Sequence, residues 1–204
     1  MKNQPAGRTP PAGIAFMWAI VFPVVAGLAI HAYQHPRTYL HPEPGGLIEV
    51  IFWTATLAIV ELLPLPVTRV VHLSLGFPIV LGIAILYSPP LAAAIALVGS
   101  FDSREIRREI DPLKSLFNRA QIALSVLAGS FLFHHFASIK SSLIVLGPSI
   151  FLATIAHYFV NTLLVILAMR LIYGLPLRKV LAQMRVGTAT EFLLNYFGLG
   201  SSAP

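Results

Sequence analysis

Apolar and polar residues alternate along this chain in long blocks rather than with a short period. Apolar stretches separated by short polar segments recur from end to end, and most reach the roughly 20 residues that a helix needs to cross a ~30 Å hydrocarbon core. The pattern predicts an all-α membrane protein, a bundle of six transmembrane helices over residues 13–32, 47–65, 67–87, 91–101, 116–136 and 149–173. The fourth helix is short for a span, so we expect it to be tilted, half-inserted or buried among the others.

Proline and glycine residues divide the apolar blocks. We expect a kink at Pro23, a turn at Pro64-Leu65-Pro66, a break in the third helix at Gly76-Phe77-Pro78, a turn at Ser88-Pro89-Pro90, and a break at Gly147-Pro148 that opens the sixth helix. Neighbouring helices make such proline and glycine positions tolerable inside a membrane.

The segment 99–121 is the main polar block and holds nine of the 22 charged residues. Asp102 and Glu105 resemble a capping box, which predicts a short charged helix over 103–110, and Asp111-Pro112 is expected to stop it. Acids and bases are interleaved here, so we expect a solvated, internally neutralised surface. This coupling surface comprises Asp102, Arg104, Glu105, Arg107, Arg108 and Glu109.

Lysine and arginine residues predict the orientation of the bundle. With the N-terminus inside and six spans, twelve of the 14 bases lie on the inner side, and only Arg37 and Lys140 lie outside. Basic loops favour the cytoplasm, so both termini are predicted to be cytoplasmic. Residues 1–12 are expected to be a disordered tail, 13–173 the bundle, and 174–204 a basic amphipathic segment at the membrane surface.

Composition agrees with the membrane assignment and excludes several classes of function. Hydrophobic residues make up 56% and charged residues 11% of the 204 positions, with a mean hydropathy of +0.79. The chain has no cysteine, which excludes disulfides and thiolate ligands. The bases are scattered at helix ends and form no basic face, so we expect no nucleic acid partner. The expected partners are the lipid bilayer and a cytoplasmic protein, and no cofactor is expected.

Polar residues inside the predicted spans are the candidate ligand site. Asn118, Gln121 and Ser125 share one face of the fifth helix, and His157 and Asn161 share one face of the sixth. Such residues either hydrogen-bond neighbouring helices or line a cavity for a small-molecule ligand. Arg119, near the inner interface, is expected to reach towards the headgroups.

A second candidate lies across the turn between the second and third helices. Glu61 precedes this turn, and Arg69 and His72 follow it. An ion pair there would lower the cost of burying both charges and lock the hairpin. The alternative is a proton or ligand site that opens to the cytoplasm.

Histidine residues collect on the predicted outer side. His31, His35 and His41 lie near Glu43 and Glu49 in sequence, whereas His134 and His135 end the fifth helix. Imidazole and carboxylate groups can bind a transition metal or sense pH near neutrality. The spacing matches no established metal motif, and interfacial histidines are the alternative.

Signatures of catalysis are missing from the sequence. It contains no G-x-S-x-G, H-E-x-x-H, phosphate-binding loop or dinucleotide-binding fingerprint. We therefore expect that the chain is not an enzyme.

One motif resembles a known bacterial module. Gly99-Ser100-Phe101-Asp102, Arg104-Glu105 with Arg108-Glu109, and the run from Leu116 to Ser125 are similar to the multi-helix membrane sensor regions of cyclic-di-GMP signalling proteins. The pair Asn161-Thr162 fits the same pattern, and the resemblance covers roughly residues 70–175.

This resemblance implies a sensory module of the bacterial inner membrane. In that family a GGDEF or HD-GYP catalytic domain follows the membrane part, but this sequence contains neither motif before it ends at Pro204. We therefore expect a truncated or stand-alone module that couples a ligand or membrane signal to a cytoplasmic partner. Two alternatives stay open, the substrate-binding membrane subunit of an energy-coupling-factor vitamin transporter and a structural scaffold.

Overall fold

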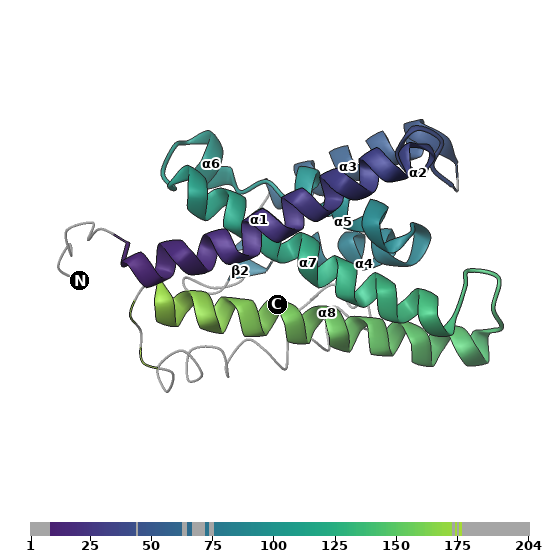
Figure 1. Ribbon diagram of the computed structural model, residues 1–204. Helices are drawn as coiled ribbons and strands as arrows, with labels where there is room; N and C mark the ends of the chain where they lie inside the picture. The colour runs from purple at the N-terminus through teal and green to yellow at the C-terminus, as the bar shows by residue number, and fades with distance from the viewer. Residues whose placement is uncertain are drawn as a thin grey trace.

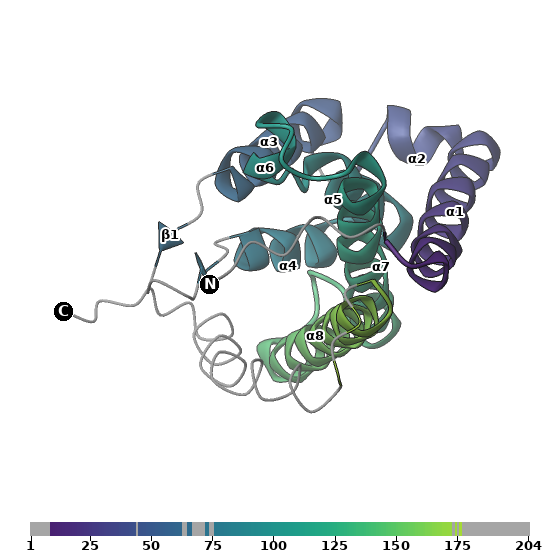
Figure 2. The same ribbon diagram turned by 90° about the vertical axis from the view of Figure 1, so that its left-hand side faces the viewer.

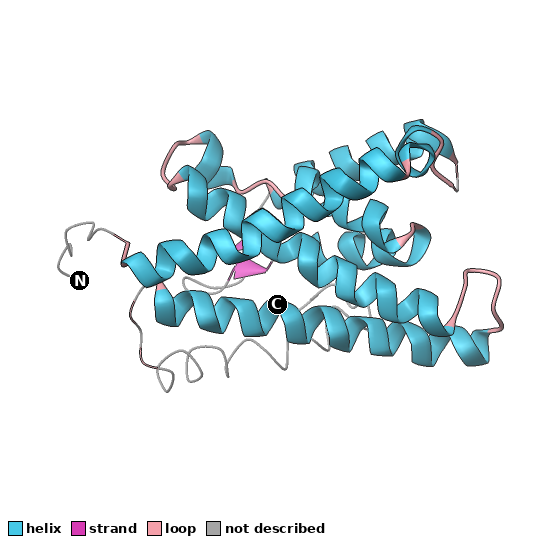
Figure 3. Ribbon diagram, viewed as in Figure 1, coloured by secondary structure: helices cyan, strands magenta, loops and turns pink. Residues whose placement is uncertain are grey.

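The structure, a computed structural model, describes residues 9–43, 45–62, 65–66, 72–73, 76–172, 174 and 176. These residues are almost entirely helical (Figure 3). The long helices are α1 (Pro11–Gln34), α7 (Pro112–Phe136) and α8 (Leu143–Leu171). The shorter helices are α2 (Pro36–Leu40), α3 (Gly46–Glu61), α4 (Gly76–Leu86), α5 (Pro89–Gly99) and α6 (Ser103–Ile106).

Three helices in the described part of the chain are long and apolar enough to cross a membrane, namely α1, α7 and α8. The first turns of α1 and α6 lie at one end of the molecule, and α2 and the α7–α8 connection lie at the other (Figure 1). The prediction of an all-helical membrane protein is therefore confirmed. The predicted number of six spans and their orientation stay predictions.

Helix α7 is the central element of the bundle. It contacts α8, α5, α1 and α4, and Figure 2 shows these helices grouped around it. Its apolar and small residues are buried at Phe117, Ala120, Ala123, Val126 and Phe133. Small residues let helix backbones approach closely, which is how membrane helices associate without a hydrophobic drive between them.

Helices α4 and α5 have 11 residues each, about 16 Å of helix at 1.5 Å per residue. Neither reaches across a ~30 Å core alone. Most of helix α5 is instead buried: Leu91, Ala92, Ile95 and Ala96 belong to a buried cluster with Leu57, Ile83 and Val126, whereas Val98 is exposed. Of the three expectations for this segment, burial among other helices agrees with the structure.

The prediction of a helix over 67–87 is wrong at residues 72–73, which form a strand. Leu65–Pro66 (β1) pairs antiparallel with His72–Leu73 (β2), and α4 begins only at Gly76. Proline lacks an N–H and fits the first turn of a helix. Pro78, as the third residue, therefore marks a helix start, where we had predicted a break.

Two other helix boundaries also differ from the predictions. Asp111 accepts a hydrogen bond from the Leu113 N–H at 2.9 Å and caps α7, so Asp111-Pro112 begins a helix as well as ending the previous segment. Helix α8 begins at Leu143 and continues through Pro148, which a membrane helix tolerates at the loss of one backbone bond. Glycine and proline at 147–148 therefore do not open this helix.

Candidate functional site

The segment between α5 and α7 contains a partly buried charge pair. Arg119 on α7 donates from Nε to Glu105 Oε1 at 3.4 Å and from Nη2 to Glu105 Oε2. The two side chains are only 12% (Glu105) and 18% (Arg119) exposed. The Arg119 guanidinium carbon also lies 3.9 Å from the centre of the Phe101 ring. We call Phe101, Glu105 and Arg119 the junction.

Local backbone structure fixes the position of Glu105. Its Oε1 accepts a hydrogen bond from the Asp102 N–H at 3.3 Å, which is the backward half of the predicted capping box. Burial by itself raises the pKa of Glu105. Hydrogen bonds from Arg119 and Ser115, the positive charge of Arg119 and the Asp102 N–H outweigh that effect, so the pKa of Glu105 is lowered.

The partner of Glu105 differs from the one that the interleaved charges suggested. Within the segment itself, Arg107 and Glu109 form an ion pair at 3.8 Å, with side chains 61% and 52% exposed, and exposed pairs contribute little. The helix is also shorter than predicted, since α6 ends at Ile106 and Arg108 adopts a left-handed backbone with φ 55°. The expectation that Arg119 reaches towards headgroups is wrong, because a carboxylate and a ring enclose it.

The first turns of α7 connect the junction with the end of α8. Phe117 and Ala120, which flank Arg119, pack in one buried cluster with Ala168 of α8, Ile172 directly after α8, and Met17 of α1. The rings of Phe16 and Phe117 lie 5.5 Å apart. The N-terminal part of α7 therefore packs against the end of α8 and the first half of α1.

The polar residues predicted inside the spans are brought together in part. Gln121 Nε2 donates to Asn161 Oδ1 at 2.9 Å, joining α7 to α8, and Ser125 Oγ donates to the Gln121 carbonyl at 2.8 Å. His157 is buried, and its ring lies 5.0 Å from that of Phe77. Asn118 is half-buried. Gln121 and Asn161 thus bond one another, as the helix–helix alternative requires.

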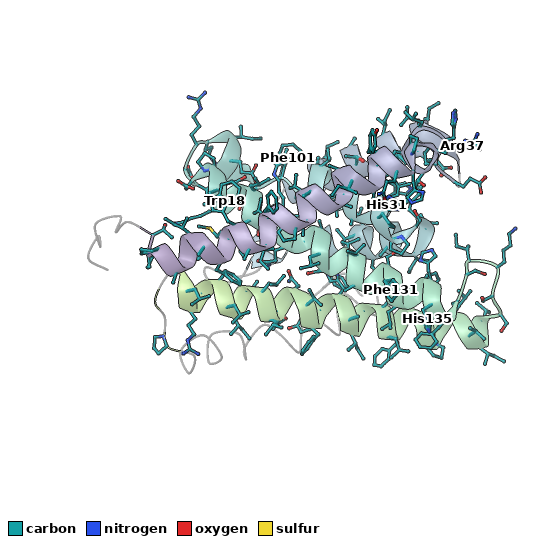
Figure 4. All side chains as sticks on the ribbon, in the orientation of Figure 1. Trp18, His31, Arg37, Phe101, Phe131 and His135 are labelled. Atoms are coloured by element: carbon teal, nitrogen blue, oxygen red, sulfur yellow. The ribbon has the colours of Figure 1, made fainter. Side chains whose placement is uncertain are left out.

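His31 and His135, from the two pairs of histidines predicted on the outer side, lie towards the same end of the bundle (Figure 4). His31 bonds the Tyr39 hydroxyl through Nδ1 at 3.1 Å and lies 4.7 Å from the His35 ring. His134 Nδ1 lies 3.0 Å from the Ser130 carbonyl oxygen, and His135 stacks on Phe131. In the described part of the chain no three His, Asp or Glu side chains gather to hold a metal ion. The predicted metal site therefore has no set of ligands among these residues.

Two further predicted contacts fall outside the described residues. Arg69 is one of the residues left undescribed, and His72 is described only as part of β2, so the proposed pairing with Glu61 stays a prediction. The side chain of Arg104, in the coupling surface, also lies outside the described residues.

Sequence reasoning missed the partners of Arg119 and of His31. Phe101 and Tyr39 were not selected, and Glu105 was not paired with Arg119, which is 14 residues away. One signal was available: an arginine in the second turn of an apolar helix needs an anion within reach, because an unpaired charge is costly there. Asp111, Glu109 and Glu105 are the nearest acidic residues in sequence, and the sequence offers no way to choose among them.

A scan against protein-family models matches residues 13–197 to MASE9. The match covers most of the chain, so the chain belongs to the MASE9 family, one of the MASE-type membrane-associated sensor domains. Domains of the MASE type occur in cyclic-di-GMP signalling proteins. No curated protein and no solved structure matches the chain.

Proposed function

We propose that this MASE9-family chain is a non-catalytic sensory module of the bacterial inner membrane. It passes a ligand or membrane state through the junction to a cytoplasmic partner or to a signalling domain of the cyclic-di-GMP type. The single observation that carries the proposal is the family match over residues 13–197. No observation favours the transporter or scaffold alternatives.

The proposal includes six passes with both termini in the cytoplasm. Helix α3 follows α2, and α5 precedes α6, so each leads from the α2 end of the molecule to the α6 end (Figure 1). The order α1, α3, α4, α5, α7, α8 then alternates in direction, which supports the topology that the basic residues predict. Half-length α4 and α5 are compatible with it because they pack against other helices.

Labelling of single cysteines tests this topology without background, because the natural chain has none. A membrane-impermeant maleimide added to intact cells should label Arg37→Cys and Lys140→Cys but not Lys114→Cys. Labelling of Lys114→Cys from outside would overturn the orientation.

Coupling requires an element with two arrangements whose balance the signal shifts. We assign this role to the junction, because a partly buried ion pair links the short α6 to α7 and the flanking residues pack against the end of α8. Breaking or re-forming this pair would move α6 relative to α8. The cytoplasmic partner would read that movement.

Distance measurement between spin labels tests the coupling. Labels at Ile106→Cys on α6 and Arg170→Cys on α8 report the separation of the two elements. Glu105→Gln removes the charge of the junction, and we expect a shifted or broadened distance distribution. Glu109→Gln removes the same charge from the exposed pair and should leave the distribution unchanged. Identical distributions in all three proteins would contradict the proposal.

The signalling assignment has its own test in cells. Expression of the full chain should change the cellular cyclic-di-GMP level, with Glu105→Gln weakening the change and Glu109→Gln preserving it. An unchanged level in cells that contain the protein in their membrane would overturn the cyclic-di-GMP part of the proposal.

A further inference from the structure

An apolar slot lies between α1, α5 and α7, on the side of α7 away from the contact with α8. Its volume is about 290 Å³, at the lower end of the range for small-molecule pockets, roughly 300–1,000 Å³. Eleven of its twelve lining residues are Ala, Ile, Pro, Val, Gly or Leu, among them Pro23, Gly27, Ala93 and Leu127. The exception is His31, so the slot combines apolar walls with one imidazole.

The Tyr39 hydroxyl is the hydrogen-bond partner of that imidazole. Burial raises the pKa of the Tyr39 hydroxyl, so it stays protonated and can donate to His31 Nδ1, which lies 3.1 Å away. A neutral imidazole that accepts at Nδ1 carries its proton on Nε2. His31 then has a donor to offer to an occupant of the slot.

The charges around this end of the slot favour an anionic group. His35 lies 4.7 Å from His31 in ring separation, and Arg37 follows on α2, at the same end of the molecule (Figure 4). From Thr9 to Pro42 the sequence contains no acidic residue, and the next acids are Glu43, directly after this stretch, and Glu49 in the first turn of α3. An N–H donor beside a second imidazole, with a guanidinium at the same end of the molecule, suits a carboxylate.

We propose that the slot binds a single-chain monocarboxylate of the fatty-acid class, with its carboxylate on His31 and its chain along Pro23, Ala93 and Leu127. This ligand assignment deepens the proposed sensory function and rests on it only for its biological role. Binding itself requires the slot and His31 alone.

Helix α1 connects the slot with the junction, so binding in the slot can alter the junction. Pro23 removes one backbone hydrogen bond, Gly27 follows one turn later, and both line the slot. A helix bends most readily at such positions. The N-terminal half of α1 packs on α7 through Phe16 and Phe117, two residues before Arg119. A chain that enters the slot would change the angle between the two halves of α1.

Photocrosslinking tests the proposal on the full chain in phosphatidylcholine nanodiscs. The probe is hexadecanoic acid with a diazirine in its chain, and mass spectrometry locates the crosslinks. We expect crosslinks on slot residues, competed by unlabelled hexadecanoic acid and at least ten times less effectively by hexadecanol. His31→Phe should lower labelling at least tenfold, and Gly27→Leu, which fills the slot, should abolish it.

Three controls make the outcome decisive. His135→Phe changes a histidine at the same end of the bundle but outside the slot, and it should label normally. A second groove of about 440 Å³ between α3 and α5, lined by Val50, Thr54, Leu91 and Val98 among others, contains no basic residue and should not be labelled competitively. Thermal unfolding of each variant checks its folding, and Gly27→Leu keeps the test valid if His31→Phe fails to fold.

Several results would overturn the assignment. Equal labelling of both grooves means ordinary partitioning of lipid chains, and equal competition by hexadecanol means that the carboxylate is not recognised. A phospholipid retained in the slot and not displaced by the acid would also overturn it. Specific labelling with no change in the Ile106–Arg170 distance would keep the slot and contradict the signalling role. If Glu105→Gln changes the Ile106–Arg170 distance but no slot residue is labelled, the ligand proposal is overturned and the coupling proposal is not.

Discussion

The contact between α7 and α8 differs from the contact between the middle of α1 and α7, and two glycines make the difference plain. A Cβ atom added to Gly129 on α7 would lie 2.9 Å from the Ala153 carbonyl oxygen and 3.3 Å from His157 Cβ on α8. A Cβ atom added to Gly27 on α1 would meet nothing within 4 Å. Gly129 lies in the close contact between α7 and α8, which we call the seam, and Gly27 borders the open slot.

The comparison shows what small residues do in a bilayer. Lipid chains are as apolar as leucine, so helices associate through close packing and interhelical hydrogen bonds. The seam has both, with Gly129 at the closest approach and Gln121 bonded to Asn161. The slot has neither along its walls, and its polar group, His31, is at one end. The seam therefore stabilises the fold, and the slot is available for a ligand.

The largest effect should come from the junction, at the charged end of α7. Helix α7 belongs to both the seam and the slot. Arg119→Ala leaves Glu105 partly buried without its cation, and we expect a loss of about 3 kcal/mol in the free energy of unfolding, as for other broken buried pairs. Equilibrium unfolding in mixed detergent micelles measures it. Arg107→Ala, in the exposed pair, is the control and should change the value by less than ~0.5 kcal/mol. Equal effects of the two changes would contradict the burial of the junction.

Closing the seam with one methyl group should come next in size. Gly129→Ala places Cβ against a backbone oxygen that cannot rotate away, so α7 and α8 must separate. We expect a loss of about 2 kcal/mol, within the range for overpacking, measured by the same unfolding experiment. A neutral result would mean that the helices are not in close contact at Gly129.

Acid should weaken the junction selectively. The folded-state pKa of Glu105 lies below its ordinary value of 4.5, so its contribution to stability is complete above pH 4.5 and is lost as the pH falls through the lower folded-state pKa. We expect Glu105→Gln to flatten the loss of stability in acid, whereas Glu109→Gln should keep the wild-type slope. Parallel curves for wild type and Glu105→Gln would contradict the lowered pKa.

A smaller effect is expected from the hydrogen bond across the seam. Asn161→Leu removes its bond with Gln121, and an interhelical hydrogen bond in a membrane contributes about 0.6 kcal/mol. A double-mutant cycle with Gln121→Leu isolates this coupling energy. A coupling energy of zero would show that the two amides do not stabilise the seam together.

The smallest expected effect is a gain in stability, opposite in sign to the effect of Gly129→Ala. Gly27→Ala makes the same chemical change as Gly129→Ala, but the added methyl group enters open space. Alanine favours the helix over glycine, so we expect a gain of about 0.5 kcal/mol. A loss as large as that of Gly129→Ala would mean that the slot is closed in the folded protein.

Several features could be predicted from sequence because they depend on local chemistry. The apolar blocks predicted the membrane helices, and the spacing of Asp102 and Glu105 predicted the turn in which Glu105 accepts the Asp102 N–H. Prolines were harder to interpret, since Pro78 and Pro112 lie in the first turns of helices and Pro148 lies within one. A proline fits all these places, and only the neighbouring helices decide among them.

The sequence by itself determined that this protein is a helical membrane protein with one charged segment, because hydropathy and charge are properties of the residues themselves. Only the tertiary structure decided that Glu105 pairs with Arg119, that Gln121 meets Asn161, and that α1 and α7 leave a slot ending at His31. These contacts join residues on different elements, and many pairings of the same helices would satisfy the same hydropathy. The physical reason is that burial in a bilayer fixes which segments insert, whereas packing and charge pairing fix how the inserted helices meet.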